Sequence, residues 1–160
     1  MLIEMNVEGL LFDPRSSMYI LLLKEIEGDG RLPIWIGKPE ADSIALALGK
    51  VVTPRPLTHD LIKNITDGLK VRITKIIVTE ILENTYYALV CLNDGKKETL
   101  IDSRPSDAMA LGLRAKAPIY VAEKVMTSSG INQDMIDADP EEQLKAVLDS
   151  LKPEDFGGKV

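Results

Sequence analysis

The runs LKVRITKIIVTEIL (69–82), TYYALVCL (85–92) and ETLID (98–102) decide the fold. Each run is rich in β-branched or aromatic residues, which are typical of strands. The breaks between them contain Asn84 and the tripeptide Asn93-Asp94-Gly95, which favour tight turns. Because such short turns reverse the chain, the three runs predict an antiparallel meander.

Residues 1–11, 18–26 and 32–37 add three further expected strands upstream of the meander. The segment EGDG (27–30) separates the last two, and Asp-Gly is a strong hairpin signal because a type I′ turn needs positive φ at both central residues. Pro33 has no backbone N–H, so we expect the third of these strands to begin or to border a sheet.

The spacing of apolar residues changes to the helical period in segments 40–49, 59–68 and 106–116. A strand over 119–125 follows the third helix, and a short helix ends the apolar pattern near residues 144–151. The sequence therefore predicts a single α+β domain with a mixed, mostly antiparallel sheet packed by three to four helices.

Two segments that begin 65 residues apart resemble each other, namely PIWIGKPEADSIALALG (33–49) and ETLIDSRPSDAMALGLR (98–114). Each combines a strand, a tight turn with a proline, and a helix of small residues with an acid near its start. We interpret them as an internal strand–turn–helix pseudo-repeat.

The net charge of −6 is concentrated near the C-terminus. Residues 132–160 contain eight acids and three lysines, so they carry −5 and the rest of the chain carries −1. We therefore divide the 160 residues into a domain (1–125) and an acidic C-terminal extension with a short helix (126–160). A strongly basic platform for nucleic acid is excluded, so an anion must bind at a local patch.

Several other classes are excluded by what the sequence lacks. No apolar run approaches the ~20 residues that cross a bilayer, and the first residues carry acids where a signal peptide needs basic ones. We therefore expect a cytoplasmic protein without a membrane partner. Cys91 is the single cysteine and His59 the single histidine, which excludes an internal disulfide and a Cys/His zinc cluster.

The common catalytic signatures are also missing: Walker loop, GxGxxG, GxSxG, HExxH and EF-hand loop. A Ser-His-Asp triad would have to use His59, and no nucleophile elbow accompanies it.

The first polar cluster that interrupts the apolar pattern is PRPLTHD (54–60). Two prolines stiffen the backbone around Arg55, whose guanidinium can bind a phosphate or a carboxylate. His59 and Asp60 lie at an expected helix N-terminus, which favours anions. The alternative is structural, because Thr58 and Asp60 are also the residues that cap a helix.

The second cluster is DSRPSD (102–107), where an expected strand leads into a helix. Asp102 and Asp107, with Glu40 or Asp60, could hold Mg²⁺ or Mn²⁺, because hard cations prefer carboxylate oxygens. The structural alternative is that Asp107 complements the helix dipole and that Asp102 forms an ion pair with Arg104.

Taken together, LPIWIG (32–37), EADSIALAL (40–48), PRPLTHDL (54–61) and DSRPSDAMALGLRAKAPIYV (102–121) resemble the bifunctional nuclease (BFN) domain family, over about residues 1–125. The resemblance implies an α+β domain. It also implies DNase and RNase activity, the two activities that give the family's plant members their name. It assigns ten positions to family motifs: Glu40, Arg55, Thr58, His59, Asp60, Asp102, Ser103, Arg104, Ser106 and Asp107.

Our hypothesis from the sequence is a cytoplasmic nuclease, a hydrolase that cleaves phosphodiester bonds of RNA, DNA or both with a divalent metal (Mg²⁺ or Mn²⁺). Glu40, Asp102 and Asp107 are the expected metal ligands. The expected catalytic residues are His59, Asp60, Arg55 and Arg104, with His59 as general base or acid and the arginines on the phosphate. The alternative is a non-catalytic anion-binding or protein-interaction module. We expect a homo-oligomer, with a dimer favoured, in either case.

Overall fold

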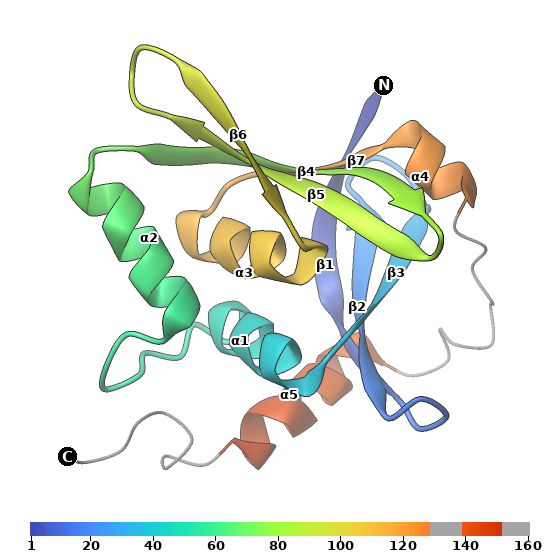
Figure 1. Ribbon diagram of the computed structural model, residues 1–160. Helices are drawn as coiled ribbons and strands as arrows, with labels where there is room; N and C mark the ends of the chain where they lie inside the picture. The colour runs from blue at the N-terminus through green and yellow to red at the C-terminus, as the bar shows by residue number, and fades with distance from the viewer. Residues whose placement is uncertain (129–138, 152–160) are drawn as a thin grey trace.

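The computed structural model describes residues 1–128 and 139–151 (Figure 1). Its elements follow in the order β1 (Leu2–Asp13), β2 (Met18–Glu25), β3 (Arg31–Ile36), α1 (Lys38–Leu48), α2 (Thr58–Gly68), β4 (Arg72–Leu82), β5 (Thr85–Asn93), β6 (Glu98–Ser103), α3 (Pro105–Ala115), β7 (Ile119–Ala122), α4 (Glu123–Ser128) and α5 (Pro140–Ser150). The predicted short C-terminal helix is thus present as α5.

The strands form one seven-stranded sheet in the order β3-β2-β1-β7-β4-β5-β6. Every pair of neighbours is antiparallel except β4 and β7, which are parallel. The predicted meander is β4-β5-β6, with Ile76 opposite Val90 and Val90 opposite Ile101. A mixed, mostly antiparallel α+β domain is therefore confirmed.

The described residues form five helices, not three to four, because part of an expected strand is helical. The strand predicted over 119–125 ends at Ala122, and Glu123 begins α4. Strand β1, its antiparallel neighbour, starts at Leu2, which pairs with Ala122. The backbone N–H of Glu123 still donates to the carbonyl of Met1 at 3.0 Å, and the chain continues from there as α4.

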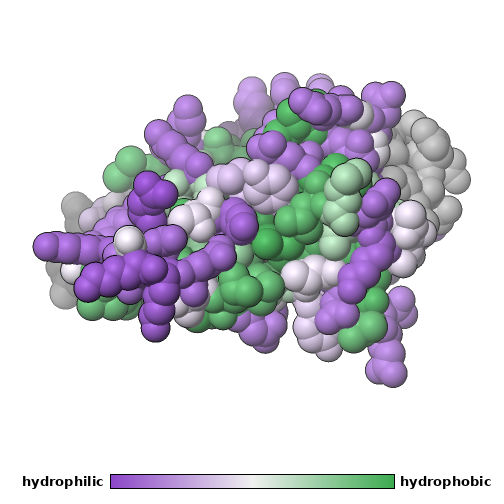
Figure 2. Space-filling model, turned by 90° about the horizontal axis from the view of Figure 1, so that it is seen from above, coloured by the Kyte–Doolittle hydropathy of each residue, from purple (hydrophilic) through white to green (hydrophobic). Residues whose placement is uncertain are grey.

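Helices α1, α3 and α5 enclose the core against one face of the sheet (Figure 1). Leu10, Leu21, Ile44, Ile76 and Met109 are fully buried there. Helix α5, which lies in the predicted C-terminal extension, packs on β1 and α1 and adds to the same core. Seen from above, hydrophobic residues gather in the middle of this face of the molecule, and hydrophilic ones lie mostly around them (Figure 2). The homo-oligomer expected from the sequence, with a dimer favoured, stays a prediction.

The sheet curls strongly, which brings distant strands together. Tyr86 of β5 donates a hydrogen bond from its hydroxyl to the carbonyl of Pro33 in β3, although these strands are not neighbours in the sheet. The ends of β3 and β6 lead directly into α1 and α3. The curl therefore places the first turns of these two helices side by side. The two predicted strand–turn–helix segments exist as β3–α1 and β6–α3, but a repeat is not confirmed.

None of the helices that the structure describes has the length and apolar character needed to cross a membrane.

Gly112 determines how closely α3 approaches the sheet. A Cβ at this position would lie 2.6 Å from Cγ1 of the buried Ile76 in β4. We expect Gly112→Ala to lower the free energy of unfolding by about 1–3 kcal/mol, because the helix must move away from the sheet. Gly68→Ala is the matched control, since a Cβ there meets nothing within 4 Å. Urea unfolding followed by circular dichroism measures both. A free energy of unfolding for Gly112→Ala equal to that of the parent protein would show that the position of α3 does not depend on this contact.

Candidate functional site

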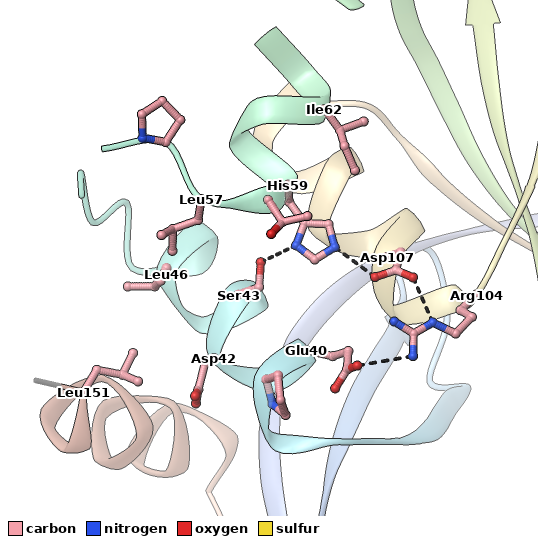
Figure 3. Close-up of a pocket in the computed structure, with 13 residues that line it drawn as sticks. Glu40, Asp42, Ser43, Leu46, Leu57, His59, Ile62, Arg104, Asp107 and Leu151 are labelled. Atoms are coloured by element: carbon pink, nitrogen blue, oxygen red, sulfur yellow. Dashed lines mark hydrogen bonds and ion pairs between the residues drawn. The ribbon is translucent and has the colours of Figure 1, made fainter. Parts of the chain in front are cut away.

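A pocket of about 790 Å³ opens where the first halves of α1, α2 and α3 meet (Figure 3). Acids, one arginine, one histidine and apolar side chains share its wall. The lining residues are Pro39, Glu40, Asp42, Ser43, Leu46, Pro56, Leu57, Thr58, His59, Ile62, Arg104, Asp107 and Leu151. Because a helix N-terminus presents unpaired backbone N–H groups, this place suits a negatively charged ligand.

Arg114 holds the three helices together behind the pocket. Its side chain is only 9% exposed, and its Nε donates to Oδ1 of Asp60 in α2 at 2.7 Å. Its other two nitrogens donate to the carbonyl of Ser43 in α1 at 3.2 Å and to that of Ala110 in α3 itself at 2.9 Å. One guanidinium therefore fixes the relative positions of α1, α2 and α3.

Five polar side chains form a continuous hydrogen-bonded row along the pocket wall (Figure 3). Oγ of Ser43 lies 2.7 Å from Nδ1 of His59, and Nε2 of His59 lies 2.9 Å from Oδ1 of Asp107. Nε of Arg104 donates to Oδ2 of Asp107 at 2.8 Å, and Nη1 of Arg104 donates to Oε1 of Glu40 at 3.2 Å. The row joins residues from all three helices and the residue before α3.

The charge of Asp107 decides how the protons in the row are arranged. Burial acts to raise the pKa of Asp107, but hydrogen bonds from Arg104 and His59 and their charges outweigh it and leave the pKa below its usual range. An ionised carboxylate only accepts hydrogen bonds. A neutral His59 therefore carries its proton on Nε2, and its Nδ1 accepts the hydroxyl proton of Ser43.

The structure brings half of the sequence-predicted residues to the pocket: Glu40, Thr58, His59, Arg104 and Asp107. The others lie elsewhere. Arg55 is exposed on the connector before α2, and Asp102 is exposed on β6.

The remaining three predicted residues, Asp60, Ser103 and Ser106, also lie outside the pocket. Asp60 binds Arg114 and accepts the backbone N–H of Leu57, as the capping alternative expected. The hydroxyl of Ser103 donates to the carbonyl of Arg104. Ser106 is buried and lines a smaller hollow beside Trp35.

The predicted metal ligands do not gather into a ligand set. Within residues 1–128 and 139–151, no three His, Cys, Asp or Glu side chains lie where they could hold a metal ion. Glu40 and Asp107 instead share Arg104, and Asp102 does not line the pocket. Dependence on a divalent metal stays a prediction.

Two residues at the site, Ser43 and Arg114, are not among those predicted from the sequence. Ser43 follows Asp42 and precedes an apolar run, and a polar pair at the start of a small-residue helix is the only signal it leaves. Arg114 is the single charged residue between Asp107 and Lys116 in the helical segment, which indicates a buried partner.

The comparisons with known proteins agree with the motifs. A model of the bifunctional nuclease domain matches residues 21–134. An uncharacterized protein of Mycobacterium tuberculosis is 37% identical, over 96% of this chain and 97% of its own length. Bifunctional nuclease 1 of Oryza sativa subsp. japonica is 27% identical over 81% of this chain, and Bifunctional nuclease 2 of Arabidopsis thaliana is 29% identical over 75%. The aligned part is 40% and 37% of those plant proteins.

The contact between Asp60 and Arg114 predicts a pH-dependent stability. Burial acts to raise the pKa of Asp60, but hydrogen bonds from Arg114 and Leu57 outweigh it and leave the pKa below the usual 3.8. The ionised form therefore stabilises the fold above that value, and the stabilisation is lost as the pH falls through the lowered pKa. We expect Asp60→Asn to cost about 1–3 kcal/mol at pH 7 and to match the parent protein at low pH.

Denaturant unfolding across pH 2–7 measures this difference. Asp67→Asn, at the other end of α2 and in an exposed pair with Lys63, is the control and should change stability by less than about 0.5 kcal/mol. A cost for Asp60→Asn that did not vary with pH would show that the charge of Asp60 does not stabilise the fold.

Proposed function

The chain belongs to the bifunctional nuclease domain family, as its motifs predicted. On this premise, we propose that it hydrolyses phosphodiester bonds of RNA, DNA or both in the pocket between α1, α2 and α3. The observation that carries the proposal is the hydrogen-bonded row, which sets a histidine–aspartate pair next to an arginine on a concave wall. Nucleic acid is then the partner of this surface.

Arg104 and the helix N-termini support phosphate binding. The side chain of Arg104 is 64% exposed, and only its Nε and Nη1 bond to other described residues. Its Nη2 is thus able to donate to a phosphate oxygen, and guanidinium groups bind phosphate well. The positive ends of α1, α2 and α3 add to this attraction.

Cations offset the acids of the pocket only in part. Glu40 and Asp107 bind Arg104, and Asp42 binds Lys38 at 2.9 Å. These three acids and two cations leave one negative charge, so phosphate binding depends on the free Nη2 of Arg104 and on the helix N-termini, not on a basic patch.

His59 supports the chemistry of cleavage. Its Nδ1 is the basic nitrogen of the neutral ring, so it can take a proton during attack on phosphorus and return it to the leaving oxygen. Asp107 orients the ring and stabilises the imidazolium that forms, as a carboxylate does in other histidine-based sites.

The size of the pocket favours unpaired nucleotides as the substrate. A volume of about 790 Å³ is in the range of pockets that enclose one small molecule. A nucleotide from a single strand can enter such a pocket, whereas a base-paired one has to leave its helix first, at a cost of a few kcal/mol.

Cleavage of labelled single- and double-stranded RNA and DNA tests the proposal, with Mg²⁺, Mn²⁺ or EDTA in parallel. We expect cleavage by the purified protein, faster on single strands. His59→Gln should be slower by about 100-fold or more, because it removes the proton acceptor. Arg104→Gln should also be slower, because phosphate binding weakens.

Arg72→Gln is the matched control for Arg104, since Arg72 is an exposed arginine at the start of β4, outside the pocket. It should cleave like the parent protein. Equal rates for the parent and His59→Gln, or no cleavage of any substrate, would contradict the proposal. The parallel reactions with Mg²⁺, Mn²⁺ or EDTA determine separately whether cleavage requires a divalent ion.

A further inference from the structure

We propose that Ser43 is the nucleophile of this site and that cleavage passes through a covalent phosphoseryl intermediate. The inference rests on the proposed function, because it takes a phosphodiester as the substrate. It adds a catalytic role for Ser43 and a covalent step, neither of which the predicted metal chemistry contains.

The placement of Ser43 is the first support. Its Oγ lies on the pocket wall, 2.7 Å from Nδ1 of His59, which is the distance at which a base activates a serine. The backbone at this residue is fixed as well, because Ser43 lies within α1 and its carbonyl accepts a bond from the nearly buried Arg114. The hydroxyl is therefore held where a reacting phosphate enters.

The second support is that both nitrogens of His59 are occupied by protein groups. Nε2 bonds to Asp107, and Nδ1 bonds to Ser43. Water can reach the basic nitrogen only by displacing the serine. The first proton that His59 accepts therefore comes from Ser43 and not from water.

The remaining residues of the row keep the ring in the active tautomer. Arg104 holds Asp107 ionised, and Glu40 holds Arg104. If Asp107 were neutral, Nε2 could lose its proton, and Nδ1 would then donate to the serine oxygen and could not take its proton. Arg104 and Glu40 thus act as positioning residues for the serine, besides the contact of Arg104 with phosphate.

The first step forms the bond from Oγ of Ser43 to phosphorus and breaks the bond from phosphorus to the leaving oxygen. The hydroxyl proton passes to Nδ1 of His59 and then to the leaving oxygen, which departs as an alcohol. Esterified Ser43 no longer donates, so Nδ1 is open to water. Water attacks phosphorus, its proton passes through His59 to Oγ, and the serine is regenerated with a phosphomonoester product.

A fluorophosphonate probe tests the activation of Ser43 without nucleic acid, because it phosphonylates activated serines with release of fluoride. We expect one adduct per chain, located on Ser43 by peptide mass spectrometry. Ser43→Ala should give none, and His59→Gln should react about 100-fold more slowly. Ser128→Ala is the control, since Ser128 is an exposed serine at the end of α4, and it should be labelled like the parent protein.

A second measurement captures the intermediate itself. End-labelled single-stranded oligonucleotide is mixed with the protein and quenched in SDS, and a labelled protein band is expected for the parent and not for Ser43→Ala. Far-UV circular dichroism and urea unfolding establish that the variant is folded. Cleavage by folded Ser43→Ala at the parent rate, or no probe adduct on Ser43, would overturn the inference and leave the nuclease proposal intact. An adduct on Ser43 without cleavage of any nucleic acid would overturn the nuclease proposal and keep Ser43 as an activated nucleophile.

Discussion

The pocket depends on one nearly buried guanidinium. Arg114 bonds to a carboxylate of α2, to a carbonyl of α1 and to a carbonyl of its own helix, α3. A buried charge is tolerated only when it is paired and its donors are satisfied, and Asp60 together with the two carbonyls does so. His59 directly precedes Asp60 in the first turn of α2, and Ser43 bonds to Arg114 through its carbonyl and to His59 through its hydroxyl. The contacts of Arg114 therefore also fix the spacing between Ser43 and His59. Structural and chemical roles are thus divided between adjacent residues of one motif.

The sheet supplies the second constraint, because it decides which helix ends meet. Its curl, marked by the bond from Tyr86 to Pro33, brings the starts of α1 and α3 together from distant positions in the strand order. Gly112 lets α3 lie close against Ile76. This contact sets the distance between the sheet and the helix that carries Asp107 and Arg114. Arg104 then bridges Glu40 and Asp107 across the two helix starts. The first turns of α1 and α3 are consequently held in place by the packing of α3 on the sheet and by the ion pairs of Arg104.

The sequence predicted the meander, the three central helices and the two polar clusters, because periodicity and turn residues are local signals. It did not predict which members of a cluster face each other. Asp60 and His59 are adjacent in sequence, yet one points to Arg114 and the other to Ser43 and Asp107. Ser43 lies 16 residues before its partner and Asp107 lies 48 after it, so their meeting is set by the packing of three helices. The end of β7 was predicted too late, because IYVAEKV (119–125) contains no turn residue that marks the change from strand to α4.

In the proposed mechanism, Asp107 holds His59 with its proton on Nε2, so that Nδ1 takes the proton of Ser43. Because His59 is the single histidine of the chain, ¹⁵N labelling of histidine in the tag-free protein gives one pair of ring signals that report the tautomer. At a pH where the ring is neutral, we expect the Nε2–H form in the parent protein and a mixture of tautomers in Asp107→Asn. A ring protonated on Nδ1 in the parent protein would contradict the account, because that nitrogen could then not act as the base for Ser43.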